Sequence, residues 1–330
     1  MFTKKRTIYT TVLLIQLLLV GYAAGAPVVI RFSHVSSENS PTGQMALKFK
    51  ELVAKHLADR FVVEVYPDSQ FFNDDQSFEA LLMDDIQMAV PSVSKFNKYN
   101  KRLQLFDLPF LFKDIESARR FQQSLEGNYL LFNFFERGIL GLAYMNSGFK
   151  QISATTKLLT PEDASGLSFR IMSSDVLKDQ FNALGAEAVA KPFFQVFSLL
   201  STGAVDGQEN CWSNMYSKKL YTAQPYITET NHGLLSSVIV TSTNFWESLT
   251  AADQGDLKAA LNEAVAFGEK LAVEAEKNDR QKIIDSQLTE VITLTPEQRK
   301  RWVEAMKPVW KKYEKEIGQD LIDYALQANQ

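Results

Sequence analysis

The chain has 330 residues, of which 45% are hydrophobic, and a formal net charge of −4 from 35 basic and 39 acidic residues. This length and apolar content predict a large buried core divided between two domains or lobes. The acidic balance lacks the basic footprint that nucleic-acid binding requires, so no nucleic-acid partner is expected. The lone cysteine, Cys211, excludes a disulfide within the chain.

Residues 1–26 have the features of a secretory signal peptide. A basic start of three residues precedes an apolar run over 12–20, and small residues at 24–26 match a cleavage site. The apolar run is shorter than the roughly 20 residues that a membrane-spanning helix needs. We therefore expect an exported protein that starts near Pro27 after processing and is not embedded in the membrane.

Strand and helix patterns alternate along the first part of the processed chain. Apolar and β-branched residues predict strands over 28–32, 61–65 and 86–90, whereas helical spacing of apolar residues predicts helices over 45–57 and 75–84. This alternation is typical of an α/β fold.

Polar loops follow two of these predicted strands, where they would face a cleft. His34 and Glu38 lie in the loop after the first strand, although turn and helix-capping roles explain them equally well. Ser92 and Phe96 follow the third strand, where a hydroxyl could bond a ligand oxygen and a ring could form a pocket wall. Ordinary capping is the alternative for Ser92.

The strongest site pattern lies between residues 166 and 214. A predicted strand ends near Arg170, and a second strand pattern delivers Asn210, with helix patterns over 176–184 and 194–202 between them. Open α/β sheets bind ligands at such strand ends, and a guanidinium offers two parallel donors to a carboxylate. On spacing alone, pairing of Arg170 with an acidic residue of the chain is the favoured alternative, because short motifs match by chance.

The last third of the chain returns to strands over 227–240 and then becomes helical. One long helix is predicted over 253–288, about 54 Å in length, and shorter helices follow over 301–317 and 319–328. The three histidines lie far apart in sequence and none has metal-ligand spacing, so no metal site is expected.

Four segments of the central stretch together resemble a known family. They are Gly-Leu-Ser-Phe-Arg-Ile from Gly166, the segment 176–186, Pro-Phe-Phe-Gln-Val-Phe from Pro192, and Val-Asp-Gly-Gln-Glu-Asn from Val205. They resemble the solute-binding proteins of tripartite ATP-independent periplasmic (TRAP) transporters, the dicarboxylate-receptor type in particular. The resemblance extends over about 31–244, and the Gly-Gln-Glu-Asn block is its most specific part.

The resemblance implies a bilobal α/β fold like that of periplasmic binding proteins, with a hinge and a long bridging helix. The first lobe would comprise 27–147 plus about 236–275. The second would comprise 148–235 plus about 276–330.

The resemblance also implies a receptor, not an enzyme, with no cofactor. The protein would bind a small organic acid by its carboxylate in the cleft between the lobes and deliver it to an ion-gradient-driven TRAP membrane transporter. Arg170 would clamp the carboxylate and Asn210 would hydrogen-bond it, while the other pocket residues would be Lys150, where some relatives carry a second arginine, and Ser92, Phe96, His34, Glu38 and Trp212.

The sequence leaves two other functions and the ligand class open. An ATP-driven importer also uses a bilobal binding protein, and Asp206 with Glu209 could serve an exported hydrolase or lyase, although no familiar catalytic motif is present. Thr42 stands where the family often has lysine. Hydroxy, keto or aromatic monocarboxylates are therefore as open as succinate or malate.

Overall fold

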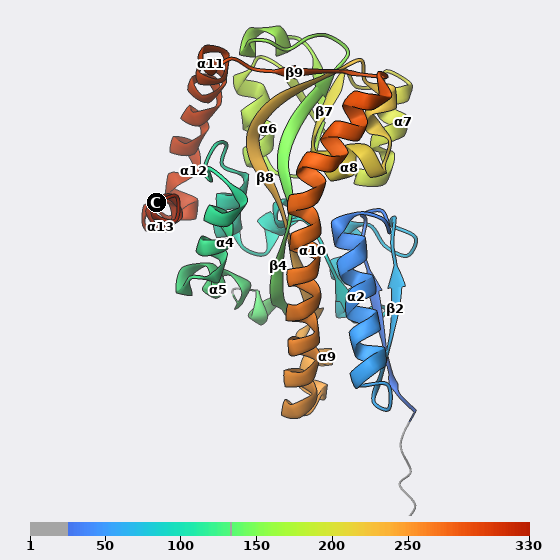
Figure 1. The fold of residues 1–330 in the computed structure, drawn as a ribbon. Helices are drawn as coiled ribbons and strands as arrows, with labels where there is room; N and C mark the ends of the chain where they lie inside the picture. Colours follow the sequence, from blue (N-terminus) through green and yellow to red (C-terminus); the bar gives the residue numbers. More distant parts are fainter. Residues whose placement is uncertain (1–25, 133) are drawn as a thin grey trace, which may run out of the picture.

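The computed structural model describes residues 26–132 and 134–330, so the predicted signal peptide, apart from Ala26, lies outside the described residues. The first part of the chain alternates strands and helices as predicted (Figure 1). Its elements are β1 (Val28–Ser33), α2 (Pro41–His56), β2 (Phe61–Tyr66), α3 (Asp74–Leu82), β3 (Met88–Ala89), η1 (Val93–Lys98), η2 (Lys101–Asp107), α4 (Ile115–Gln123), α5 (Leu125–Phe132) and η3 (Phe135–Arg137).

The remaining elements include two long strands, one of which lies where strands were predicted over 227–240. They are β4 (Ile139–Ala154), η4 (Pro161–Ala164), β5 (Ser168–Ile171), α6 (Asp175–Ala183), β6 (Glu187–Ala190), η5 (Phe193–Gln195), α7 (Val196–Ser201), β7 (Gly207–Cys211), α8 (Trp212–Ser217), η6 (Leu220–Ala223), β8 (Tyr226–Ser242), α9 (Thr243–Ser248), α10 (Ala251–Ser286), β9 (Glu290–Thr293), α11 (Pro296–Met306), η7 (Lys307–Val309), α12 (Trp310–Ile317) and α13 (Gln319–Gln327).

The sheet joins both halves of the molecule through β4 and β8. The strand order is β2-β1-β3-β8-β4-β7-β5-β6, with β9 paired to β8. β4 and β8 are antiparallel and have 16 and 17 residues. Their pairing shifts register between Gly141 and Ala143, Asn146 and Gly148, and Lys150 and Ile152. Such irregularities bend a strand pair without ending it, so one pair of strands passes through both lobes.

Separate apolar clusters show that each half of the chain has its own core. Phe32 and Phe49 pack edge to face under α2, with ring centroids 5.9 Å apart, in a cluster of the first lobe. Phe169, Phe181 and Trp302 belong to another cluster, on the side of β5 and α6. The fold is therefore bilobal α/β, as predicted.

Helix α10 bridges the two lobes and is the long orange helix in the middle of Figure 1. Its Leu257 and Leu261 belong to the cluster under α2, whereas Ile283 packs with Trp212 beside β8. Within the described residues 26–132 and 134–330, no helix combines the length and apolar character needed to cross a membrane.

The C-terminal helices contact both halves of the molecule. Trp302 of α11 packs in the cluster of β5 and α6, but Tyr313 and Leu321 pack in the cluster that contains Phe106. The sequence-based lobe boundaries, which place 276–330 in the second lobe, stay a prediction. We propose that α13 belongs to the first lobe, whereas α12 also reaches the second, where the Tyr313 hydroxyl donates to Asp179 of α6.

Two glycines give a matched test of the packing. At Gly207, at the start of β7, a Cβ would lie 2.3 Å from the Ser153 carbonyl oxygen of β4 and 2.5 Å from a ring carbon of Phe169. Gly207→Ala should therefore lower the free energy of unfolding by about 1 to 3 kcal/mol. Gly255, inside α10, has no atom within 4 Å of its Cβ position. Gly255→Ala should raise stability by about 0.5 to 1 kcal/mol. Urea denaturation measures both changes, and effects of the same sign would contradict this packing.

Candidate functional site

A cavity lies between the lobes, at the ends of the strands that predicted a site. Its lining from the first half of the chain is Val35, Ser36, Asn73, Asp74, Asp75, Val90, Ser92 and Lys95. Its lining from β4 onward is Ser147, Lys150, Arg170, Met172, Pro192, Phe193, Glu209, Asn210, Asn214, Leu235 and Ser237. Six of these residues carry ionisable side chains of both signs, so their pairing decides what the cavity can hold.

Arg170 lies near the C-terminal end of β5 and is only 2% exposed. Its Nε donates to the Lys191 carbonyl oxygen at 2.9 Å, and its guanidinium carbon lies 5.8 Å from the centroid of the Phe193 ring. Burial lowers the pKa of Arg170 to about 10, against the opposing effect of Glu209, so the guanidinium stays charged at neutral pH. Among the described residues only Nε has a hydrogen-bond partner, which leaves both terminal nitrogens available to a carboxylate.

Asn210 lies near the end of β7, and β7 pairs with β5 in parallel, so its position relative to Arg170 follows from the sheet. Its Oδ1 accepts hydrogen bonds from Asn214 Nδ2 at 2.8 Å and from the Cys211 amide at 3.2 Å. A backbone N–H can only donate, so the atom facing it must be the amide oxygen. The Asn210 Nδ2 is thereby the atom left to donate to a ligand.

Lys150 of β4 belongs to a buried chain of polar contacts. Its Nζ lies 2.9 Å from the Glu209 carboxylate, which also accepts from His232 Nε2 at 2.7 Å. Burial alone would raise the pKa of Glu209, but Lys150 and His232 lower it to about 2. Because ionised Glu209 can only accept, His232 Nε2 carries the proton and donates it in this bond, so the other ring nitrogen accepts from the Thr230 hydroxyl, 2.7 Å away.

Lys95 supplies a third cation, and sequence reasoning missed it. Its side chain is 3% exposed, and its Nζ donates to Asp75 Oδ2 at 2.8 Å and to Ser173 Oγ at 3.2 Å. Ser173 follows β5, so this contact crosses from one lobe to the other. The available signal was its place three residues after Ser92. In a 3₁₀ helix such as η1, residues i and i+3 lie on the same side.

A model of the family of bacterial extracellular solute-binding proteins, family 7, matches residues 32–316. The chain belongs to this family. The C4-dicarboxylate-binding periplasmic protein DctP of Shewanella loihica is 54% identical over 305 residues, covering 92% of this chain and 91% of the relative. DctP of Vibrio cholerae is 43% identical, with 92% and 91% covered. The resemblance to TRAP dicarboxylate receptors is thus confirmed.

Solved structures of the same kind match most of the chain. A TRAP periplasmic solute-binding protein from Shewanella oneidensis, with bound succinate, has a TM-score of 0.91 and 52% identity over 92% of this chain and 100% of that one. A protein from Pseudomonas aeruginosa, with bound L-malate, has a TM-score of 0.85 and 43% identity over 87% and 100%. These matches confirm the family's bilobal receptor fold for this chain.

Of the eight residues predicted for the site, the structure brings four together in the lining: Arg170, Asn210, Lys150 and Ser92. Glu38 is exposed and outside the lining. His34 is 2% exposed and also outside it, although the next two residues line the cavity. Burial lowers the pKa of His34 to about 4, so its ring is neutral at physiological pH. The loop of His34 and Glu38 therefore faces the cavity through neighbouring residues.

The two aromatic predictions require correction. Phe96 is 0% exposed and packs against Phe78 and Phe134. The centroid of the Phe96 ring lies 5.0 Å from the centroid of each of these two rings. Trp212 is 2% exposed and packs in the cluster of Met215 and Ile283. Phe96 comes directly after the lining residue Lys95, and Trp212 comes two residues after Asn210, but both lie in short helices, where neighbouring positions point in different directions. Their apolar rings are buried in the core while the polar positions face the cavity.

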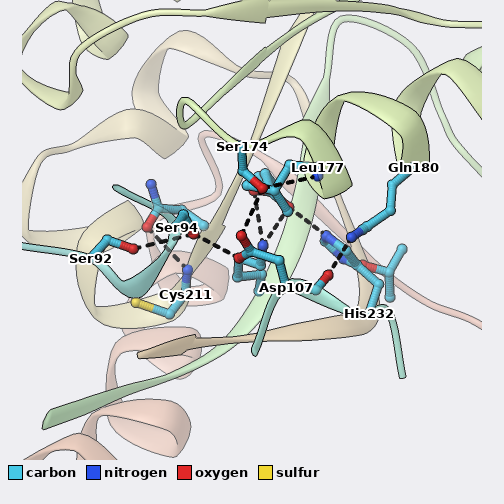
Figure 2. A network of polar contacts seen from close by, with 12 residues as sticks. Ser92, Ser94, Asp107, Ser174, Leu177, Gln180, Cys211 and His232 are labelled. Atoms are coloured by element: carbon cyan, nitrogen blue, oxygen red, sulfur yellow. Dashed lines mark hydrogen bonds and ion pairs between the residues drawn. The ribbon is translucent and has the colours of Figure 1, made fainter. Parts of the chain in front are cut away.

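The lobes of this structure are in contact beside the cavity. Figure 2 shows the Asp107 carboxylate of η2 between Ser94 of η1 and Ser174, the N-cap of α6. Ser94 Oγ and Ser174 Oγ donate to its two oxygens at 2.6 and 2.7 Å. The bond from Lys95 to Ser173 and an ion pair between Asp68 and Lys218 also connect the first half of the chain to the second. This is the arrangement expected of a closed cleft.

Proposed function

We propose that this protein is a periplasmic receptor that binds a C4 dicarboxylate such as succinate or malate and delivers it to the membrane subunits of a TRAP transporter. Export through residues 1–26 belongs to the same proposal. The observation that carries it is the placement of Arg170, Lys150 and Lys95 around one buried cavity between the lobes. Cations from both lobes suit a ligand that carries a carboxylate at each end.

Lys95 removes the sequence-based reason for giving monocarboxylates the same weight as succinate or malate. That reason was the presence of Thr42 where the family often has lysine. Thr42 is only 3% exposed, its hydroxyl oxygen lies 3.4 Å from Ser147 Oγ, and it does not line the cavity. The first lobe presents a cation through Lys95 instead. The relatives named as C4-dicarboxylate-binding proteins, and the similar structures with succinate and malate, support the same ligand class.

The acidic pair that suggested a hydrolase or lyase is engaged elsewhere. Asp206 Oδ2 accepts hydrogen bonds from the Ser168 amide and hydroxyl, each at 2.8 Å, and lies outside the cavity lining. Glu209 is held by Lys150 and His232. A general acid or base needs a group that can exchange a proton near neutral pH, and the pKa of Glu209, about 2, does not suit that role. This favours a receptor over an enzyme.

A matched pair of ligands tests the proposal. Succinate and butyrate have the same chain length, and butyrate lacks one carboxylate. Isothermal titration of the chain from Pro27 should show saturable succinate binding, with butyrate at least tenfold weaker because one cation is left without its partner. Succinate at a hundredfold its Kd should add about 2.7 kcal/mol and raise Tm by roughly 5 to 10 °C. Equal affinities for the two acids would contradict dicarboxylate recognition.

A further inference from the structure

Asp74 is a carboxylic acid in the wall of a cavity proposed to hold a dianion. It is the first residue of α3, where Asn73 caps the helix by accepting from the amides of Asp75 and Gln76. Asp75 is bonded to Lys95, but none of the ion pairs among the described residues includes Asp74. Asp74 is therefore an acid of the cavity that no cation directly neutralises.

The charges of the lining balance only if Asp74 is ionised. The cations are Lys95, Lys150 and Arg170, and the acids are Asp74, Asp75 and Glu209. Lys150 and His232 keep Glu209 ionised, and Asp75, with a side chain 52% exposed, shares its charge with Lys95. With all six groups charged, the lining is neutral overall. A dianion entering it would meet the negative charge of Asp74 inside a closed, poorly solvated space.

The surroundings of Asp74 raise its pKa even without a ligand. Burial raises its pKa to about 6, and Asp75 raises it further, against the opposing effects of Lys95, the Ser92 amide and Arg170. The other charged groups of the cavity are Lys150 of β4 and Glu209 of β7, which form their own pair. Near neutral pH without ligand, Asp74 is mostly ionised. A dianion placed beside it raises its pKa again, because a like charge disfavours the charged form.

We propose that Asp74 takes up a proton when the dicarboxylate binds, so that the receptor carries its ligand together with a proton. This inference rests on the proposed function of the same cavity. The neutral acid removes a repelling charge and gains an O–H that can donate to the ligand. Affinity should then fall as pH rises from 6 to 8, by up to about tenfold per pH unit, because the unliganded protein binds fewer protons than the complex.

Titration calorimetry in several buffers tests the proton uptake directly. Succinate is titrated into the chain from Pro27 at pH 7 in phosphate, HEPES and Tris, whose heats of ionisation differ. The slope of the observed heat against the buffer heat gives the protons taken up. We expect a value between about one half and one for the parent and near zero for Asp74→Asn. The Asn variant should also bind about tenfold or more tightly than the parent at pH 8, with an affinity that changes little from pH 6.5 to 8.

A control variant has the same charge change in the same helix. Glu79 of α3 is exposed and outside the lining, so Glu79→Gln should keep the parent's proton uptake and pH dependence. If Asp74→Asn does not fold, infrared difference spectra of the parent give an independent result. Succinate should produce the C=O band of a protonated carboxylic acid, and absence of that band overturns the proposal.

The outcomes separate this inference from the proposed function. Succinate binding without buffer-dependent heat in the parent, or with equal uptake in parent and Asp74→Asn, overturns the role of Asp74 and leaves the receptor function intact. Absence of dicarboxylate binding by the parent overturns the receptor function and the proton uptake with it.

Discussion

Arg170→Ala is expected to weaken dicarboxylate binding by about 2 to 5 kcal/mol, or roughly 30-fold to several thousand-fold. The variant loses the fork-shaped cation of the cavity and leaves a ligand carboxylate in a closed space without its partner. Neither terminal nitrogen of Arg170 has a hydrogen-bond partner among the described residues, so the hydrogen bonds lost in the variant are those to the ligand. Titration calorimetry with succinate measures the effect.

Arg170→Lys is the matched control for charge. It keeps a cation but loses the second parallel hydrogen bond, so its affinity should lie between those of the parent and the alanine variant. Some loss of stability is expected in both variants, because Arg170 is buried, donates to the Lys191 carbonyl and lies beside the Phe193 ring. Near-parental affinity combined with a lower Tm would show that Arg170 is structural only.

Glu209→Gln should destabilise the fold by about 3 to 5 kcal/mol, the largest stability effect expected here. Lys150 is 2% exposed and has no other ion-pair partner among the described residues, so the substitution leaves a buried ammonium without a counter-charge. The change preserves the size and shape of the side chain. Chemical denaturation of the ligand-free protein at pH 7 measures the loss.

The double variant Glu209→Gln with Lys150→Met identifies the cause. Removing the lysine charge as well should restore much of the lost stability, because an uncharged pair of similar size carries no desolvated charge. Additive losses in the two single variants and the double variant would show that the pair is not coupled, contrary to the 2.9 Å contact.

The acid response of Glu209 follows from the direction of its pKa shift. Its pKa is about 2 in the folded protein, against an ordinary value of 4.5. A depressed pKa means that the stabilisation is fully present above pH 4.5 and is lost as pH falls toward 2. The stability difference between the parent and Glu209→Gln should shrink over that range. A constant difference down to pH 2 would contradict the shift.

The sequence alone determined the parts of the site that depend on local secondary structure. The alternation of strand and helix patterns defined the α/β fold, and the ends of β5 and β7 placed Arg170 and Asn210. These strands are parallel neighbours, with Arg170 opposite Gln208, so side chains at their C-terminal ends must lie close together. A strand has a short and fixed repeat, so the direction of each of its side chains can be predicted from the neighbouring sequence.

Only the folded chain shows which side chains of a short helix face the cavity and which face the core. The segment after β3 read as a loop, for which no residue direction can be assigned. As the 3₁₀ helix η1 it turns Ser92 and Lys95 to the cavity and Phe96 to the core. The sequence predicted strands over 227–240, but only the folded chain shows that they form one strand, β8, that pairs with β4 through both lobes.

The charge balance of the cavity also belongs to the tertiary structure. Lys95 meets Asp75 from a different element and Ser173 from the other lobe, 20 and 78 residues away in the chain. Lys150 and Glu209 meet because β4 and β7 are antiparallel neighbours. Burial in the cavity raises the pKa of Asp74 and the nearby Asp75 adds to the shift, against the opposing effects of Lys95 and Arg170. Sequence can supply the ionisable residues, but pairing and burial over such separations are set by how the two lobes pack, and that packing decides which charges remain for a ligand.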